Sequence, residues 1–172
     1  VPGVCDAVTH DADSEGLWGL TEDGSWQARG SAQRHKLEQG YWMLVEGTPG
    51  NDALRRLADG VDLGEFTTRA ATAERVDEPA WVWPRIPPIR VRKKIPASWL
   101  KLTLREGKNR QVRRMTAAVG YPTLRLVRYA VGPWSIEGLA PGDCRLITTD
   151  LDDDAGKTTS KRVKNVSPRQ PP

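Results

Sequence analysis

The chain has 172 residues, of which 28% are charged, and it carries a modest formal net charge of +4. That length allows one sizeable hydrophobic core or two small lobes. The sequence shows no apolar run of membrane-spanning length and no signal peptide, and Cys5 and Cys144 have neither metal-ligand spacing nor a disulfide framework. These features argue against membrane and disulfide-rich secreted classes, and we expect a protein of the reducing cytoplasm.

A cluster of carboxylates precedes the first apolar run. Asp11, Asp13 and Glu15 lie close together before residues 17–20, and residues 21–24, Thr-Glu-Asp-Gly, form a turn signal. The spacing lacks the ligand number of a calcium loop, and the two histidines of the chain are too few for a histidine-based metal site. Taken alone, the cluster is typical of a solvated loop before a strand.

Apolar periodicity predicts three elements in the next part of the chain. Residues 41–46 read as a strand, and residues 51–58 read as a helix that Gly60 ends. Residues 66–76 have mixed alternation and predict another strand.

Residues 79–90 predict an extended arm, because their prolines disrupt regular helix. Trp81 and Trp83 are interleaved with cations in this arm. The pattern suits a groove for single-stranded nucleic acid, although aromatic side chains that anchor an arm to its own domain are at least as common. The residues alone leave both interpretations open.

Residues 98–130 form the most informative stretch. Leucines alternate with other residues through 98–104, which is the period of a half-buried strand, and a second alternating run spans 123–131. Asn109 is placed to cap a helix that runs to about Val119. The apolar face of this helix has Val112, Met115 and Val119, and its opposite face has Arg110, Arg113, Arg114 and Ala117.

Positive charge is concentrated between residues 85 and 114, where Glu106 is the single acidic residue. A basic helix face can be explained by charges that simply point to solvent. The local imbalance favours a different explanation, since such a concentration repels itself unless an anion such as a phosphate backbone lies on it. The cations are Arg85, Arg90, Arg92, Lys93, Lys94, Lys101, Arg105, Lys108, Arg110, Arg113 and Arg114.

The C-terminal part of the chain begins with a turn at residues 139–143. A last strand is predicted at residues 144–148. Residues 152–172 are polar and basic with several prolines, which predicts a disordered basic tail.

Several stretches together resemble the RsuA-like ribosomal RNA pseudouridine synthases, most closely the E-type enzymes that act on large-subunit ribosomal RNA. The resemblance covers roughly residues 8–149, and its longest part is the run from Ser98 to Tyr129. The other matching stretches are His10 to Leu17 with Leu20 to Gly24, His35 to Glu38 with Tyr41 to Gly47, and Pro87 to Pro96.

The resemblance implies an α+β fold, with a curved, mixed and mostly antiparallel sheet and flanking helices. The catalytic domain would span residues 1–151 and be N-terminally incomplete, because family members carry an Asn-Lys-Pro strand ahead of the aspartate motif that this chain lacks. The disordered tail would span residues 152–172. The implied activity is cofactor-free and metal-free conversion of a specific uridine in large-subunit ribosomal RNA to pseudouridine, by a monomer with no membrane partner.

The resemblance also implies residue roles. The aspartate that opens the Asp-x-Asp-Ser-Glu-Gly stretch is catalytic in the family and matches Asp11, and Tyr41 and Arg113 match its other active-site positions. A carboxylate can act as the nucleophile, a guanidinium can keep it ionised by forming a charge-assisted pair, and a phenol ring offers the uracil a flat face. We expect RNA-binding cations at Lys108, Arg110, Arg114, Arg90, Arg92 and Lys93.

The chain departs from the family pattern at two motif positions. Thr9-His10 stand where the family has Arg-Leu before the aspartate, and Gln39 stands where it has a lysine. The family arginine is implied to help extrude the target base, so its replacement favours an alternative, a catalytically impaired RNA-binding protein that retains the synthase scaffold. The retained catalytic matches favour the enzyme. A third hypothesis, a basic DNA-binding module, rests on charge alone.

Overall fold

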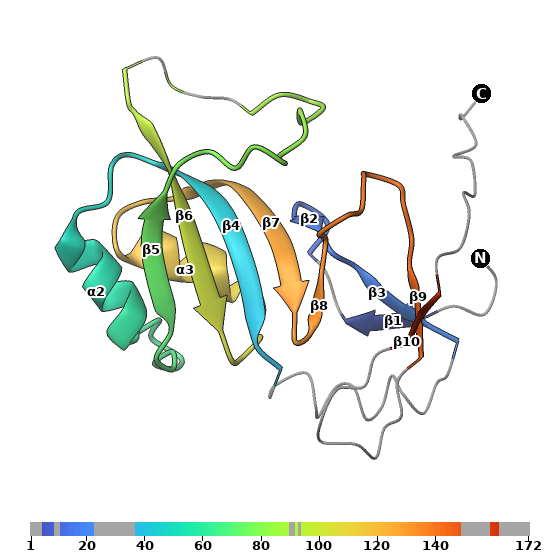
Figure 1. Cartoon of the computed structure of the whole chain (residues 1–172). Coiled ribbons are helices and arrows are strands. Elements are labelled where there is room, and N and C mark those ends of the chain that lie inside the picture. Colours follow the sequence, from blue (N-terminus) through green and yellow to red (C-terminus); the bar gives the residue numbers. More distant parts are fainter. Residues whose placement is uncertain are drawn as a thin grey trace. The chain divides into compact units, whose positions relative to one another are not determined.

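A computed structural model describes residues 5–8, 11–22, 37–89, 92, 94–148 and 159–161 (Figure 1). The chain divides into two compact units, Val1–Ser135 and Ile136–Pro172. This division precedes the domain boundary predicted at residue 151. Among the described residues, no helix is long and apolar enough to cross a membrane.

The first unit is built on a mixed sheet in the order β2-β7-β4-β6-β5, with β8 also paired to β7. Only the β2–β7 pairing is parallel, and the other pairings in this sheet are antiparallel. A separate antiparallel pair joins β1 to β3. The bounds are β1 Cys5–Val8, β2 Glu15–Gly16, β3 Gly19–Thr21, β4 Gln39–Glu46, β5 Thr72–Val76, β6 Ala97–Leu104, β7 Thr123–Val131 and β8 Trp134–Ser135.

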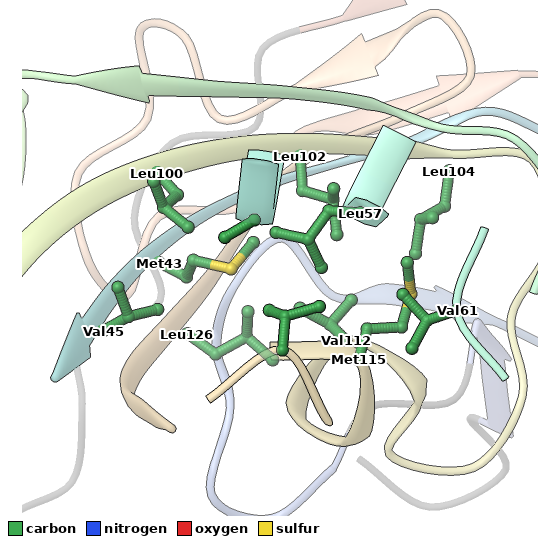
Figure 2. Close-up of a cluster of buried hydrophobic side chains, with 12 residues drawn as sticks. Met43, Val45, Leu57, Val61, Leu100, Leu102, Leu104, Val112, Met115 and Leu126 are labelled. Carbon is green, nitrogen blue, oxygen red and sulfur yellow. The ribbon is translucent and has the colours of Figure 1, made fainter. Parts of the chain in front are cut away.

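Two helices, α2 (Asn51–Asp59) and α3 (Gln111–Ala118), share one core with the sheet. Strand alternation places Leu100, Leu102 and Leu104 of β6 on the same buried face as Met43 of β4. Figure 2 shows these side chains meeting Leu57, Val61, Val112, Met115 and Leu126. The predicted α+β fold, with its mixed sheet and flanking helices, is therefore confirmed.

The start of α3 differs from the prediction. The residue that precedes the helix is Arg110, in the left-handed region at φ 48°, and not Asn109. The side-chain hydrogen bond at this end comes from Gln111, whose Oε1 accepts the backbone N–H of Lys108 at 3.0 Å. The predicted apolar face is confirmed, since Val112 and Met115 are buried.

The strand predicted at residues 66–76 is shorter in the structure, where β5 begins at Thr72. The residues just before Thr72 bond to groups elsewhere in the chain. Arg69 N–H donates to the buried Glu106 carboxylate at 2.7 Å, and Thr68 Oγ1 accepts the Val61 N–H at 2.9 Å. These side-chain hydrogen bonds take the place of a sheet ladder at this point of the chain.

The second unit contains β9 (Leu146–Thr148) paired antiparallel with β10 (Thr159–Lys161). The strand predicted at 144–148 thus begins at Leu146. Thr159–Lys161 depart from the disordered tail predicted for 152–172, because their backbone groups pair with β9. The rest of that predicted tail lies outside the described residues.

Candidate active site

The loop that carries Asp11 is attached to the edge of the sheet through β2 and β7. Leu17 N–H donates to the carbonyl of Arg128 at 2.7 Å. In return, Arg128 Nε and Nη2 donate to the Leu17 carbonyl at 3.0 and 2.8 Å. Arg128 is 3% exposed and faces Tyr41 across the β4–β7 pairing. The aspartate motif is therefore held at β7, the strand that lies between β2 and the strand with the predicted tyrosine.

Asp13 joins the same loop to the start of α3. Arg110 binds its carboxylate with both terminal nitrogens, at 2.9 and 3.1 Å. Arg113 Nη2 donates to the Asp13 carbonyl at 2.8 Å, and Arg113 Nε lies 3.5 Å from Asp13 Oδ2. The hydrogen bond from Arg110 lowers the pKa of Asp13, although burial opposes this effect. Asp13 therefore holds both arginines against the motif loop.

The carboxylate partner of Arg113 differs from the sequence-based expectation. Among the described residues, its ion-pair partner is Asp13 and not Asp11. Burial lowers the pKa of the Arg113 guanidinium, whereas the negative charges of Asp13 and Asp11 raise it. Asp11 therefore acts on Arg113 through its charge and without a direct contact.

Three groups act on the hydroxyl of Tyr41, namely Gln39, Arg128 and Asp11. Its hydroxyl donates to Gln39 Oε1 at 2.8 Å. Burial raises the pKa of this hydroxyl, and the charge of Asp11 adds to the rise, whereas Arg128 lowers it by charge and hydrogen bonding. The net pKa is raised, so the phenol is neutral at physiological pH.

The three predicted catalytic residues thus come from a loop, a strand and a helix. Asp11 precedes β2, Tyr41 belongs to β4 and Arg113 belongs to α3. The negative charge of Asp11 is close enough to perturb the pKa of both Tyr41 and Arg113. The fold brings all three into one electrostatic neighbourhood.

Glu15 connects the motif to the arm that follows β5. Its carboxylate accepts Arg125 Nε and Nη2, both at 2.9 Å, and Trp83 Nε1 at 3.0 Å. Trp81 packs edge-on against Trp42, with ring centroids 5.6 Å apart. These contacts support the interpretation that the aromatic residues anchor the arm to its own domain.

The predicted RNA-binding cations differ in how firmly the protein holds them. Lys108 Nζ lies 3.4 Å from the centroid of the Phe66 ring. Arg114 donates to the Glu65 carboxylate at 3.2 Å. Arg92 donates to Glu46 at 3.3 Å and is exposed. Arg90 and Lys93 lie outside the described residues.

Sequence reasoning assigned no role in this site to five residues that organise it, namely Asp13, Glu15, Gln39, Arg125 and Arg128. The signal for the two arginines was present, because a cation within an otherwise apolar strand must be paired or hydrogen-bonded when buried. In the part of the chain that the structure describes, no group of three or more His, Cys, Asp or Glu side chains is gathered so that it could hold a metal ion.

Comparison with known proteins shows which family the chain is similar to. Residues 10–118 match the family model for RNA pseudouridylate synthase. The "Ribosomal large subunit pseudouridine synthase E" of Xanthomonas axonopodis pv. citri (strain 306) is 52% identical over 81% of this chain and 74% of its own. The protein of the same name from Vibrio parahaemolyticus serotype O3:K6 (strain RIMD 2210633) is 47% identical, over 80% of this chain and 57% of its own.

The fold has a matching solved structure. A crystal structure of a pseudouridylate synthase superposes with a TM-score of 0.61 at 26% identity, covering 77% of this chain and 50% of that one. The sequence-based resemblance is therefore confirmed. The chain belongs to the RNA pseudouridylate synthase family.

Proposed function

We propose that this chain isomerises a specific uridine of large-subunit ribosomal RNA to pseudouridine, with Asp11 as the nucleophile and no cofactor. The observation that carries the proposal is the match of residues 10–118 to the RNA pseudouridylate synthase family, a span that includes Asp11, Tyr41 and Arg113. The charge of Asp11, which acts on both other side chains, supports it. The name of the relative that is 52% identical supports the choice of large-subunit ribosomal RNA.

The reaction rearranges one nucleoside without changing its composition. An Asp11 carboxylate oxygen bonds to the base or the sugar of the target uridine, and the N-glycosidic bond breaks. The uracil turns and rejoins the ribose through C5. The C5 proton leaves, a proton is gained at N1, and the carboxylate is released for the next cycle.

Arg113 would keep the nucleophile ionised within a closed site. Its Nε is buried and has no hydrogen-bond partner in the described part of the chain, and Asp13 Oδ2 lies 3.5 Å from it. The guanidinium therefore retains a donor that a substrate-bound Asp11 carboxylate can use. A charge-assisted pair of this kind favours the ionised carboxylate.

Tyr41 would support the uracil ring as it turns. Its neutral phenol sits on β4, whose two neighbours in the sheet hold it on both sides. The target uridine must first leave its stack, which costs a few kcal/mol. Exposed cations beside the motif loop, such as Arg110, would offset part of this cost by binding the neighbouring phosphates.

One observation favours the second candidate, an RNA-binding protein that no longer catalyses. Thr9-His10 stand immediately before Asp11, where the resemblance calls for Arg-Leu. A site that lacks the arginine for base extrusion would still bind RNA through its cations. The two candidates therefore differ in turnover and not in binding.

The test is release of tritium from RNA labelled at uridine C5. The expected result is release from a large-subunit transcript that plateaus at the level of a single site, with none from a small-subunit transcript of similar size. Equal release from both transcripts would contradict the proposed substrate. Tight binding of the large-subunit transcript without release would establish the RNA-binding candidate, and preferential binding of duplex DNA would contradict both.

A further inference from the structure

Gln39 is a buried amide whose side chain hydrogen-bonds to Tyr41 of the predicted site. It is 3% exposed, and its Oε1 accepts the Tyr41 hydroxyl proton at 2.8 Å. The two residues are separated by one position on β4 and so lie on the same face of the strand. A side chain this deeply buried must have its polar atoms satisfied, and the phenol supplies one partner.

The position of the amide is constrained from its other side. A Cβ atom placed on Gly107 would lie 3.0 Å from Gln39 Nε2. The glycine therefore leaves room for the amide at the point where β6 leads towards α3. A side chain at position 107 would therefore press on the Gln39 amide.

The hydroxyl of Tyr41 lies between an acceptor and a donor. A phenol has one proton to donate and two lone pairs that accept. The proton goes to Gln39, and Arg128, which faces Tyr41 across the β4–β7 pairing, lowers the pKa of the hydroxyl by charge and hydrogen bonding. The other charged group that acts on this hydroxyl is Asp11, from the loop before β2. This arrangement fixes both the ring and the direction of its proton.

We propose that Gln39 is a positioning residue, which holds the Tyr41 hydroxyl proton on its amide oxygen and thereby sets the ring against which the uracil turns. The inference rests on the proposed function for its meaning in catalysis. The contact from Gln39 to Tyr41 does not depend on turnover and can be tested without it. A lysine at this position could only donate to the phenol oxygen and would hold the hydroxyl differently.

The contact is tested in the full chain by NMR of tyrosine labelled with carbon-13 at Cζ. The chain has three tyrosines, so comparison with Tyr41→Phe assigns the signal of Tyr41. Gln39→Lys should lower the pKa of Tyr41, and Gln39→Glu should raise it, each by on the order of 1 to 3 pH units. Gln39→Leu should lower this pKa by less, because the neutral phenol loses its acceptor.

Gln111→Leu is the matched control. Gln111 is also a buried amide at 3% exposure, but its hydrogen bonds go to Glu106, Lys108 and Met115. This variant should lose stability and leave the Tyr41 signal unchanged. An unchanged Tyr41 pKa in the folded Gln39 variants would overturn the proposal. Should the charged variants fail to fold, the neutral Gln39→Leu variant decides it in the same way.

Turnover then separates this inference from the proposed function. Gln39→Leu should lower kcat for tritium release and leave KM for RNA unchanged, because the residue orders the site and does not contact phosphate. If the parent shows no turnover but the Gln39 variants shift the pKa of Tyr41, the positioning contact stands and the proposed function is refuted. Turnover in the parent with an equal kcat in Gln39→Leu would refute the catalytic role of Gln39 alone.

Discussion

Replacing Glu15 by Gln would leave the Arg125 guanidinium without its carboxylate. The side chain of Arg125 is 5% exposed and that of Glu15 is 18% exposed, so little water can replace the lost charge. Glu15 accepts both Arg125 nitrogens at 2.9 Å and also accepts Trp83 Nε1. The substitution therefore affects the motif strand, β7 and the arm together.

The expected loss follows from the burial of the pair. Removing one partner of a buried ion pair costs about 3–5 kcal/mol, because the other charge stays desolvated. Glu15 keeps some solvent contact, and Arg125 keeps its bond to the Trp83 carbonyl at 2.8 Å. The lower end of the range, about 3 kcal/mol in the free energy of unfolding, is therefore expected for Glu15→Gln.

The assay is equilibrium unfolding in urea, with Glu74→Gln as the matched control. Glu74 pairs with Lys101 at 3.3 Å, but its side chain is 59% exposed. Loss of such a surface pair costs about 0–1 kcal/mol. Equal unfolding free energies for the two variants would refute the argument that the Glu15 network is desolvated and holds the motif in place.

Three further predictions use other parts of the molecule. Leu57→Ala should lower the unfolding free energy by about 2–5 kcal/mol, because Leu57 is 1% exposed in the shared core. A loss below about 1 kcal/mol would mean that the surrounding side chains fill the cavity left by Leu57. Because the pKa of Asp13 is lowered in the folded protein, Asp13 stabilises the fold above its unfolded pKa, and this stabilisation fades as pH falls through its folded pKa. The unfolding free energies of the parent and Asp13→Asn should thus differ at pH 7 by under about 1 kcal/mol and converge in acid. A difference that grows in acid would contradict this direction. Arg110→Ala should weaken RNA binding and reduce the slope of the log binding constant against log salt concentration by about 1. An unchanged slope would show that Arg110 does not contact phosphate.

Much of the central sheet could be predicted because its pattern is local. The alternation through residues 123–131 matches β7 (Thr123–Val131), and alternate leucines mark the buried face of β6. The apolar stripe of α3 was equally clear, since Val112 and Met115 recur at helical spacing. In these segments the local period and the tertiary environment agree.

The missed features depend on residues far apart in the chain. Arg113 pairs with Asp13, and nothing in the local pattern distinguishes Asp13 from Asp11 as the partner. The start of α3 likewise depends on Arg110, whose side chain is held by the same distant carboxylate. The motif supplied the residue types, but the pairing required three-dimensional information.

The role of the tryptophans in the aromatic arm could not be decided from the sequence. Tryptophans next to cations predict either a nucleic-acid groove or an anchor. Glu15 decides between them for Trp83, because its carboxylate takes the indole N–H at 3.0 Å. That carboxylate belongs to the aspartate motif, so sequence proximity gave no sign of the contact.

The central claim is that Asp11 is the nucleophile, and the most direct measurement is tritium release from C5-labelled large-subunit ribosomal RNA by Asp11→Asn. Asp52→Asn provides the matched control, because Asp52 lies in the first turn of α2 with a side chain that is 96% exposed. We expect that Asp52→Asn releases tritium like the parent, whereas Asp11→Asn binds the RNA and releases none. Release by Asp11→Asn at the parental rate would contradict this claim.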